Sequence, residues 1–189
     1  QLCDLELLLN GSFAPLKGFM NQKDYENVLN NMRLNNGSIF SIPITLDVNQ
    51  QFATNIKIGE EIALKDQEGV ILAILSVESI YQPSFEKEAL EVYGTNDGNH
   101  PAVNYLLNKS EEIYIGGTLI GIEKPVHYDF KSRRQSPNEL RSFFRKMGWN
   151  KVVAFQTRNP LHRAHQELTF RAAKEVEANL LIHPVVGMT

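Results

Sequence analysis

The most constraining feature of this sequence is a stretch in which an apolar strand pattern changes into a helical pattern across an Asn-Pro pair. Residues 152–155 are all apolar, Asn159-Pro160 interrupts regular structure, and helical spacing follows. The first turn of that helix would present unpaired N–H groups and the positive end of the helix dipole at the junction. Arg158, His162 and His165 add cationic or hydrogen-bonding side chains. The junction is therefore predicted to bind phosphate or sulfate.

The two histidines are three residues apart, so on a helix His162 and His165 lie on one face and can contact neighbouring oxygens of one ligand. With residues 156–160 in front of them they resemble the Q-x-R-N-P-x-H-x-x-H motif of the ATP-sulfurylase (sulfate adenylyltransferase) family, a far more specific signal than H-x-x-H alone. Further segments that resemble this family are 4–11, 15–19, 42–48, 100–102, 116–117 and 183–187. The resemblance spans the chain and is greatest with the fungal-type members.

The resemblance implies transfer of AMP from ATP to sulfate, which gives adenosine 5′-phosphosulfate and pyrophosphate in the first step of sulfate activation and assimilation. It assigns Gln156 and Arg158 to sulfate. The catalytic centre that it implies consists of Thr157, Arg158, Asn159, His162 and His165. ATP would be contacted by the same five residues and by Gln156. A planar guanidinium also suits a tetrahedral oxyanion because it presents two parallel donors. Mg²⁺ is expected to arrive with ATP, and no protein-bound metal is predicted.

A metal site is the sharper alternative role for the two histidines. H-x-x-H supplies only two ligands, and Arg163 stands where an H-E-x-x-H zinc protease has its glutamate. His183 offers a third ligand on the next predicted strand, but its place before Pro184 also fits a plain strand end. Cys3 is the single cysteine, which excludes an internal disulfide and a cysteine-based zinc site and suits a reducing, cytoplasmic compartment.

Charge divides the chain into two parts. Residues 1–130 hold 8 Lys+Arg and 18 Asp+Glu, a net charge of −10, whereas residues 131–189 hold 11 and 4, a net charge of +7. The basic linker 131–135 marks the predicted domain boundary, with one domain at 1–130 and the next from 131. A cationic segment that carries the anion-binding motif fits anionic substrates, and the acidity of the first part argues against nucleic acid as its partner.

The first part has mostly strand-like patterns. Strands are predicted at 42–48, 60–65, 70–80 and 112–122. Helices are predicted at 4–9, 21–33, 86–93 and 102–107. The core-facing side of the second helix is predicted to consist of Tyr25, Val28, Leu29 and Met32. Gly116-Gly117 indicates a bend or bulge. The family resemblance implies a PUA-like domain here.

The second part begins with a helix that has Ser136 as its cap, Pro137 in its first position and Glu139 in a capping box, and that ends at Gly148. The basic residues of this helix, Arg141, Arg145 and Lys146, either steer anions or solvate its outer face, and the second interpretation is preferred.

A strand, a helix and a second strand follow at 151–155, 163–178 and 180–185. This order predicts a parallel βαβ unit, with the first strand covered on both faces and ligands at the carboxyl ends of the strands. Leu168, Ala172 and Val176 are predicted to form the packing stripe of the helix.

The predicted fold class is therefore α/β: a mostly β PUA-like N-terminal domain followed by the first βαβ unit of a Rossmann-like nucleotidylyltransferase domain. Two parallel strands and two helices bury too little to be stable, so residues 131–189 are expected to begin a longer catalytic domain. The family's Gly-Arg-Asp-His-Ala loop, which helps hold ATP, does not occur here, so this chain alone is expected to be inactive. No apolar run is long enough to cross a bilayer. The complete protein is expected to be a soluble homo-oligomer.

Two other functions remain open at this point. One is a different H-x-x-H nucleotidylyltransferase that adenylylates an organic phosphate, which the Q-x-R-N-P lead-in disfavours. The other is a non-enzymatic RNA-binding module built on the PUA-like part, which the acidity of residues 1–130 disfavours.

Overall fold

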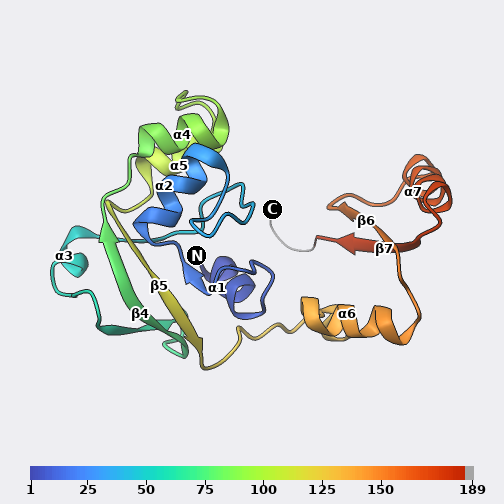
Figure 1. Ribbon diagram of the computed structural model, residues 1–189, viewed down its shortest axis with the longest axis horizontal. Helices are drawn as coiled ribbons and strands as arrows, with labels where there is room; N and C mark the ends of the chain where they lie inside the picture. The colour runs from blue at the N-terminus through green and yellow to red at the C-terminus, as the bar shows by residue number, and fades with distance from the viewer. Residues whose placement is uncertain (186–189) are drawn as a thin grey trace. The chain divides into compact units, whose positions relative to one another are not determined.

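The computed structural model describes residues 1–185. It divides into two compact units, and the boundary between them along the sequence falls between Arg134 and Gln135, within the basic linker. Figure 1 shows the elements of each unit. Val186 and Gly187, which belong to the last segment with family resemblance, lie outside the described residues. Among the helices of residues 1–185, none is both long enough and apolar enough to cross a membrane.

The first unit is built on a five-stranded antiparallel sheet with the order β1-β5-β4-β3, in which β2 also pairs with β5. Its strands are β1 (Gly18–Phe19), β2 (Leu46–Val48), β3 (Glu61–Lys65), β4 (Ile71–Tyr81) and β5 (Ile113–Gly121). The turn between β3 and β4 uses Gly69 at a φ of 88°, a conformation that suits glycine. The four predicted strand regions are thus confirmed, although the strand at 42–48 is shorter than expected.

Five α-helices accompany this sheet (Figure 1). They are α1 (Leu2–Leu9), α2 (Gln22–Asn31), α3 (Gln50–Ala53), α4 (Phe85–Tyr93) and α5 (Pro101–Asn108). In α2, Tyr25, Val28 and Leu29 are buried as predicted. The prediction for Met32 is wrong: α2 ends at Asn31, and Met32 adopts a left-handed φ of 52° with 58% of its surface exposed.

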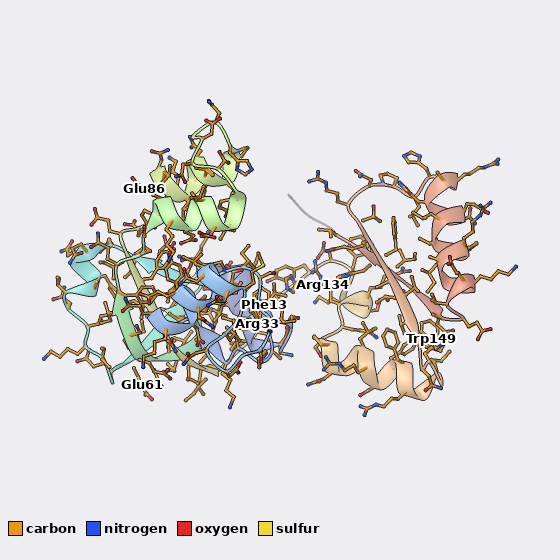
Figure 2. The ribbon with its side chains drawn as sticks, turned by 45° about the horizontal axis from the view of Figure 1, so that its top comes forward. Phe13, Arg33, Glu61, Glu86, Arg134 and Trp149 are labelled. Carbon is orange, nitrogen blue, oxygen red and sulfur yellow. The ribbon has the colours of Figure 1, made fainter. Side chains whose placement is uncertain are left out.

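The core of the first unit lies between its sheet and its helices, where side chains fill the interior (Figure 2). Its largest fully buried side chains are Met20, Val28, Leu72, Leu75, Val77 and Ile115. Ala89, Val103 and Leu106 form a smaller cluster on α4 and α5. Burial of apolar surface on this scale is the main stabilising contribution to such a domain.

The predicted bulge is present where the glycine pair of β5 meets β4, because Gly117 pairs with Val77 and Gly116 pairs with Ser79. The irregularity in pairing lies on the partner strand β4, between Val77 and Ser79. A Cβ on Gly116 would overlap the carbonyl oxygen of Met20, and a Cβ on Gly117 would overlap that of Ser76. The two glycines are therefore needed because neighbouring backbone passes directly over them.

A buried carboxylate links three elements of the first unit. Glu88 in α4 is only 7% exposed, and its Oε2 accepts hydrogen bonds from the hydroxyls of Tyr25 at 2.8 Å and Tyr114 at 3.3 Å. Desolvation raises the pKa of Glu88, the two tyrosine hydrogen bonds oppose this rise, and the charge of Asp47 adds to it. Burial also raises the pKa of both tyrosines. The group connects α2, α4 and β5 around one titratable side chain.

The second unit contains α6 (Pro137–Lys146), β6 (Val152–Thr157), α7 (Arg163–Glu175) and β7 (Asn179–Pro184). The capping box of α6 is confirmed, because the backbone N–H of Ser136 donates to Glu139 at 2.7 Å and that of Glu139 donates to the Ser136 hydroxyl at 3.4 Å. β6 and β7 pair in parallel from Val152 opposite Asn179 to Thr157 opposite Pro184, which confirms the βαβ unit.

Two packing predictions for the second unit are wrong. Leu168 and Val176, predicted to face the strands, are 59% and 48% exposed, whereas Thr169 is buried. The packed stripe of α7 is rotated by one position and uses smaller side chains, since Ala172 and Ala173 are half-buried. β6 is also not covered on both faces: Ala154 is exposed, because α7 is the one described helix that makes substantial contact with this strand.

Candidate anion-binding site

The predicted site begins inside β6. The strand runs to Thr157, two residues further than predicted, so Gln156 and Thr157 are paired residues opposite His183 and Pro184 of β7. Side chains alternate between the two faces of a strand. Gln156 is accordingly exposed, while Thr157 is half-buried. A regular strand therefore fixes the backbone of the first two site residues.

The Thr157 hydroxyl shapes the turn that follows. Its Oγ1 accepts a hydrogen bond from the backbone N–H of Asn159 at 3.0 Å and donates to the Asn159 carbonyl at 3.1 Å. The Thr157 carbonyl accepts from the N–H of Val185 at 2.8 Å. These contacts hold a tight turn of the kind that Ser and Thr side chains often stabilise. The hydroxyl of Thr157 therefore has internal partners, and this residue shapes the loop from which Arg158 projects.

Arg158 is exposed at the tip of this turn. Within residues 1–185 no carboxylate oxygen lies within the 4.0 Å of an ion pair with its guanidinium. Asn159 and Pro160 are exposed as well. An exposed arginine without an internal counterion can bind an external anion without first breaking an ion pair.

The two histidines meet at the start of α7. His162 is the residue before the first helical turn, and His165 is in that turn, with their ring centroids 5.6 Å apart. The backbone N–H of His162 donates to Nδ1 of His165 at 3.4 Å. Because Nδ1 accepts this bond, the proton of a neutral His165 lies on Nε2, which can then donate to a ligand oxygen.

Phe155 supports this arrangement and was not predicted to belong to the site. Its ring lies 5.7 Å from that of His165, at an interplanar angle of 41°. Phe155 precedes Gln156 in β6, so alternation along the strand places it on the opposite face from Gln156, the face that α7 covers. The alternation of side chains along the strand is the sequence signal from which Phe155 could have been predicted.

All six predicted site residues lie in one strand-turn-helix segment, at the carboxyl end of β6. Thr157 and His165 are half-buried, and the other four are exposed. Arg158, Arg163 and the dipole of the 13-residue helix α7 give the segment a positive field. Across residues 1–185 there is no group of three His, Cys, Asp or Glu side chains that could hold a metal ion. The segment is suited to bind and orient oxyanions.

A cavity of about 310 Å³ in the first unit is lined by the loop at 15–19 and by Asp24, Glu78 and Thr118 among others. Its two carboxylates already accept hydrogen bonds, Asp24 from the N–H of Asn35 at 2.7 Å and Glu78 from the Thr118 hydroxyl at 2.6 Å. Elsewhere in this unit, His100 accepts from the N–H of Val103 at the start of α5. These polar groups therefore serve the local structure.

Comparisons with known proteins identify relatives of this chain. A family described as a PUA-like domain matches residues 1–124, and one described as ATP-sulfurylase matches residues 131–189. The chain is 55% identical to the sulfate adenylyltransferase of Schizosaccharomyces pombe over all of its own length and 39% of that protein. It is also 55% identical to that of Neosartorya fischeri, over all of its own length and 33% of that protein.

Among solved structures, the hexameric APS kinase from Thiobacillus denitrificans matches with a TM-score of 0.78 and 34% sequence identity, over 100% of this chain and 33% of that one. This chain therefore spans 33–39% of the length of the relatives named here. Residues 1–124 are a PUA-like domain, and residues 131–189 match the ATP-sulfurylase family.

Proposed function

We propose that this chain supplies the strand-turn-helix corner, residues 156–165, at which a sulfate adenylyltransferase binds sulfate and ATP. The observation that carries the proposal is the placement of Arg158, which has no ion-pair partner in residues 1–185 and lies four residues before the histidine pair at the start of α7. The identity of 55% to sulfate adenylyltransferases from two fungi supports this choice among the functions open to an anion-binding corner.

The proposed reaction is a displacement at phosphorus. A sulfate oxygen attacks the α-phosphorus of ATP and forms a new S–O–P linkage, while the bond from that phosphorus to the oxygen that bridges to the β-phosphorus breaks and pyrophosphate leaves with the bonding electrons. Sulfate is fully ionised at neutral pH, so the attack needs no general base. The task of the protein is to hold two repelling anions in line and to stabilise the charge that develops on the leaving group.

The geometry supports a division of roles in this reaction. Arg158, with Gln156 beside it, would hold sulfate through charge-assisted and amide hydrogen bonds. His162 and His165 would donate to the phosphates of ATP, with the Nε2–H of His165 as one such donor. Thr157 and Asn159 would set the shape of the turn that brings these donors together. Mg²⁺ would enter as the MgATP substrate, bound through phosphate oxygens and water.

Three wider properties of the complete protein belong to the same proposal. The βαβ unit would be the start of a Rossmann-like nucleotidylyltransferase domain that continues beyond this chain, because one crossover helix and two strands leave the sheet partly uncovered. The complete protein would be a homo-oligomer, in line with the hexameric relative. It would act in the cytoplasm, a reducing compartment that suits a free, exposed Cys3.

The test is ATP–pyrophosphate exchange catalysed by the complete protein, measured with and without sulfate. We expect exchange that depends on sulfate. Exchange that proceeds equally well without sulfate would reject this function in favour of another nucleotidylyltransferase activity. The 189-residue chain alone is expected to show little or no exchange, because it lacks the family's Gly-Arg-Asp-His-Ala loop.

A further inference from the structure

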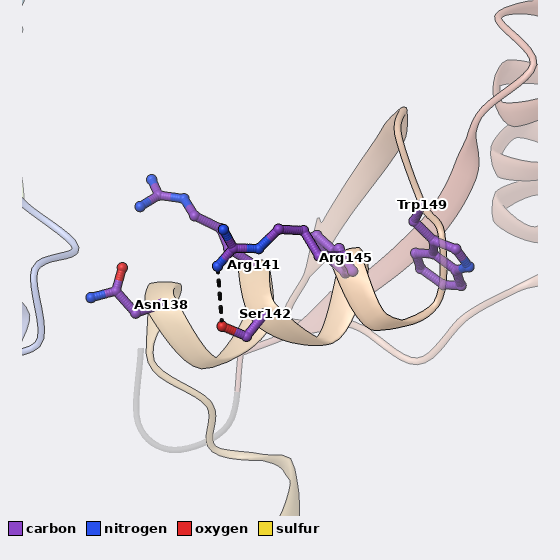
Figure 3. A pocket seen from close by; sticks show the side chains of 6 residues that line it. Asn138, Arg141, Ser142, Arg145 and Trp149 are labelled. Atoms are coloured by element: carbon purple, nitrogen blue, oxygen red, sulfur yellow. Dashed lines mark hydrogen bonds between the residues drawn. The ribbon is translucent and has the colours of Figure 1, made fainter.

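A second cationic surface lies on α6, a different element from the strand-turn-helix corner. It borders a cavity of about 490 Å³ (Figure 3). The residues that line this cavity are Asn138, Arg141, Ser142, Phe144, Arg145 and Trp149. Cavities of roughly 300–1,000 Å³ that combine aromatic walls with a few polar groups are typical of small-molecule sites. The cavity on α6 has this size, and its lining combines two aromatic residues with four polar or cationic ones.

The polar residues of the cavity follow the helical repeat. Asn138, Arg141, Ser142 and Arg145 are spaced three, one and three residues apart, so they share one face of α6. Figure 3 shows these four side chains along the helix, with Trp149 beyond its end. Nη2 of Arg145 donates to the Ser142 hydroxyl at 3.4 Å. This contact directs the guanidinium of Arg145 back along the helix, toward the turn that carries Arg141.

Neither arginine of this face is neutralised in the described part of the chain. Arg141 and Arg145 are exposed, and within residues 1–185 no carboxylate oxygen lies within 4.0 Å of either guanidinium. Like charges four residues apart on a helix repel each other and destabilise it. A bound oxyanion would relieve that repulsion and would accept hydrogen bonds from both guanidinium groups.

The opposite end of the cavity is a rigid aromatic wall. The Trp149 ring stacks on Phe144 with centroids 5.5 Å apart and an interplanar angle of 19°, and Phe143 meets it edge-on at 6.4 Å and 75°. Trp149 is half-buried, so these contacts hold its ring in place beside the cavity. An indole in this position offers stacking or edge contact to a flat organic group.

We propose that α6 and Trp149 form a binding site for a small organic phosphate or sulfate monoester that carries a planar ring. The anionic group binds Arg141 and Arg145, with Ser142 and Asn138 as neutral hydrogen-bonding partners, and the ring lies against Trp149. This assignment replaces the interpretation of the basic residues of α6 as a merely solvated face. It rests on residues outside the strand-turn-helix corner and does not depend on the proposed enzymatic function.

The test uses the 189-residue chain and its single tryptophan. Trp149 fluorescence is titrated with three probes: adenosine monophosphate, inorganic phosphate, and adenosine. We expect a saturable fluorescence change with adenosine monophosphate at sub-millimolar concentration, and binding about tenfold or more weaker with phosphate or adenosine, since each has only half of the recognised chemistry. Sulfate and phosphate monoesters are distinguished by a parallel titration with adenosine 5′-sulfate.

Four variants locate the binding event. The double variant R141Q/R145Q should weaken binding of adenosine monophosphate about tenfold or more. R141K/R145K should restore binding only in part, because lysine keeps the charge but lacks the parallel N–H donors of a guanidinium. R171Q removes an exposed arginine of α7 that is paired with Glu167 and should leave binding unchanged. R158A is the variant that reports any binding of the nucleotide at the corner of β6 and α7. Circular dichroism of each variant verifies that α6 still folds.

Three outcomes would overturn the proposal. One is the absence of any fluorescence change with adenosine monophosphate up to millimolar concentration. Another is weakened binding in R158A but not in R141Q/R145Q, which would place the nucleotide at the corner of β6 and α7. The third is equal binding of phosphate and adenosine monophosphate, which would remove the planar ring from the ligand class. None of these outcomes bears on sulfate-dependent exchange, so the two proposals fail separately.

Discussion

At the scale of single residues, the proposed chemistry depends most on Arg158. Replacement of Arg158 by alanine removes charge-assisted hydrogen bonds to sulfate, each worth about 1.5–3 kcal/mol, so kcat/KM of the complete protein should fall by about 100-fold or more. Stability should change by no more than about 0.5 kcal/mol, because the side chain is exposed and makes no internal ion pair in residues 1–185. Steady-state kinetics and thermal unfolding measure the two effects.

Arg158→Lys and Arg171→Ala are the matched variants for this measurement. Lysine at position 158 keeps the charge but loses the parallel donors, so it should recover only a small part of the activity. Arg171 is exposed on α7 and pairs with Glu167, and its loss should leave kcat/KM nearly unchanged. Activity of Arg158→Ala within about twofold to threefold of the wild type would remove Arg158 from the proposed role.

Glu88 offers a test of buried electrostatics in the PUA-like domain. Its pKa is raised in the folded state, mainly by desolvation, so the folded state binds the proton more tightly than the unfolded state does. The stability that Glu88 contributes is therefore full below its unfolded pKa and is lost as the pH rises through its folded pKa. Glu88→Gln stays neutral and should gain stability relative to the wild type as the pH rises above 4.5, the ordinary pKa of a glutamate.

Urea unfolding at several pH values measures this difference. The control is Glu86→Gln, the same replacement at an exposed position of the same helix. The amide oxygen introduced by Glu88→Gln can still accept from the hydroxyls of Tyr25 and Tyr114, which preserves the contacts that Glu88 makes at 2.8 and 3.3 Å. A pH-independent difference between Glu88→Gln and the wild type would show that Glu88 has no raised pKa.

At the scale of elements, the strand β5 depends on glycine where the chain from β1 to α2 crosses it. In Gly116→Ala the new Cβ would meet the backbone of Met20 and Asn21, and backbone cannot move aside as a flexible side chain can. We expect a loss of about 1–3 kcal/mol or more in the free energy of unfolding. Gly98→Ala is the matched control, because a Cβ there has no neighbour within 4 Å. Equal stability of the two variants would contradict the crossing.

Some features of the helices could be predicted from the sequence, and others could not. The capping box of α6 is encoded by Ser136 and Glu139 in a four-residue motif, so local chemistry sufficed to predict it. The packed face of α7 was mispredicted because large apolar residues stand next to the small ones that pack, and Thr169 rather than Leu168 is buried. Which of two adjacent stripes packs depends on how closely the helix approaches β6 and β7, and periodicity alone does not contain that distance.

The candidate site was likewise predictable only in part. Its strand-turn-helix setting follows from hydrophobic pattern and from Asn159-Pro160, so the location of the site was predictable. The hydrogen bonds of the Thr157 hydroxyl to Asn159 depend on the exact turn that the chain adopts. The contact of Phe155 with His165 likewise depends on the packing of α7 against β6. Such contacts are set by tertiary geometry, which the motif does not specify.

At the scale of the whole molecule, the two units differ in how much they bury. The buried apolar residues of the described chain belong to the first unit, and the one buried residue of the described second unit is Thr169. Stability follows buried apolar area, so the second unit should unfold at a lower urea concentration than the first. The six tyrosines lie in residues 1–134 and the single tryptophan in the second unit, which gives each unit its own spectroscopic signal.

We therefore expect the Trp149 fluorescence transition to precede the tyrosine transition in near-ultraviolet circular dichroism when urea is added. One variant in each unit verifies which unit each signal reports. Val28→Ala removes a core side chain that is 2% exposed and should lower the stability of the tyrosine transition by about 2 kcal/mol. Ser136→Ala removes the cap of α6 and should lower the Trp149 transition by about 1 kcal/mol. A single coincident transition in both signals, shifted alike by both variants, would mean that the chain unfolds as one cooperative unit despite its uneven core.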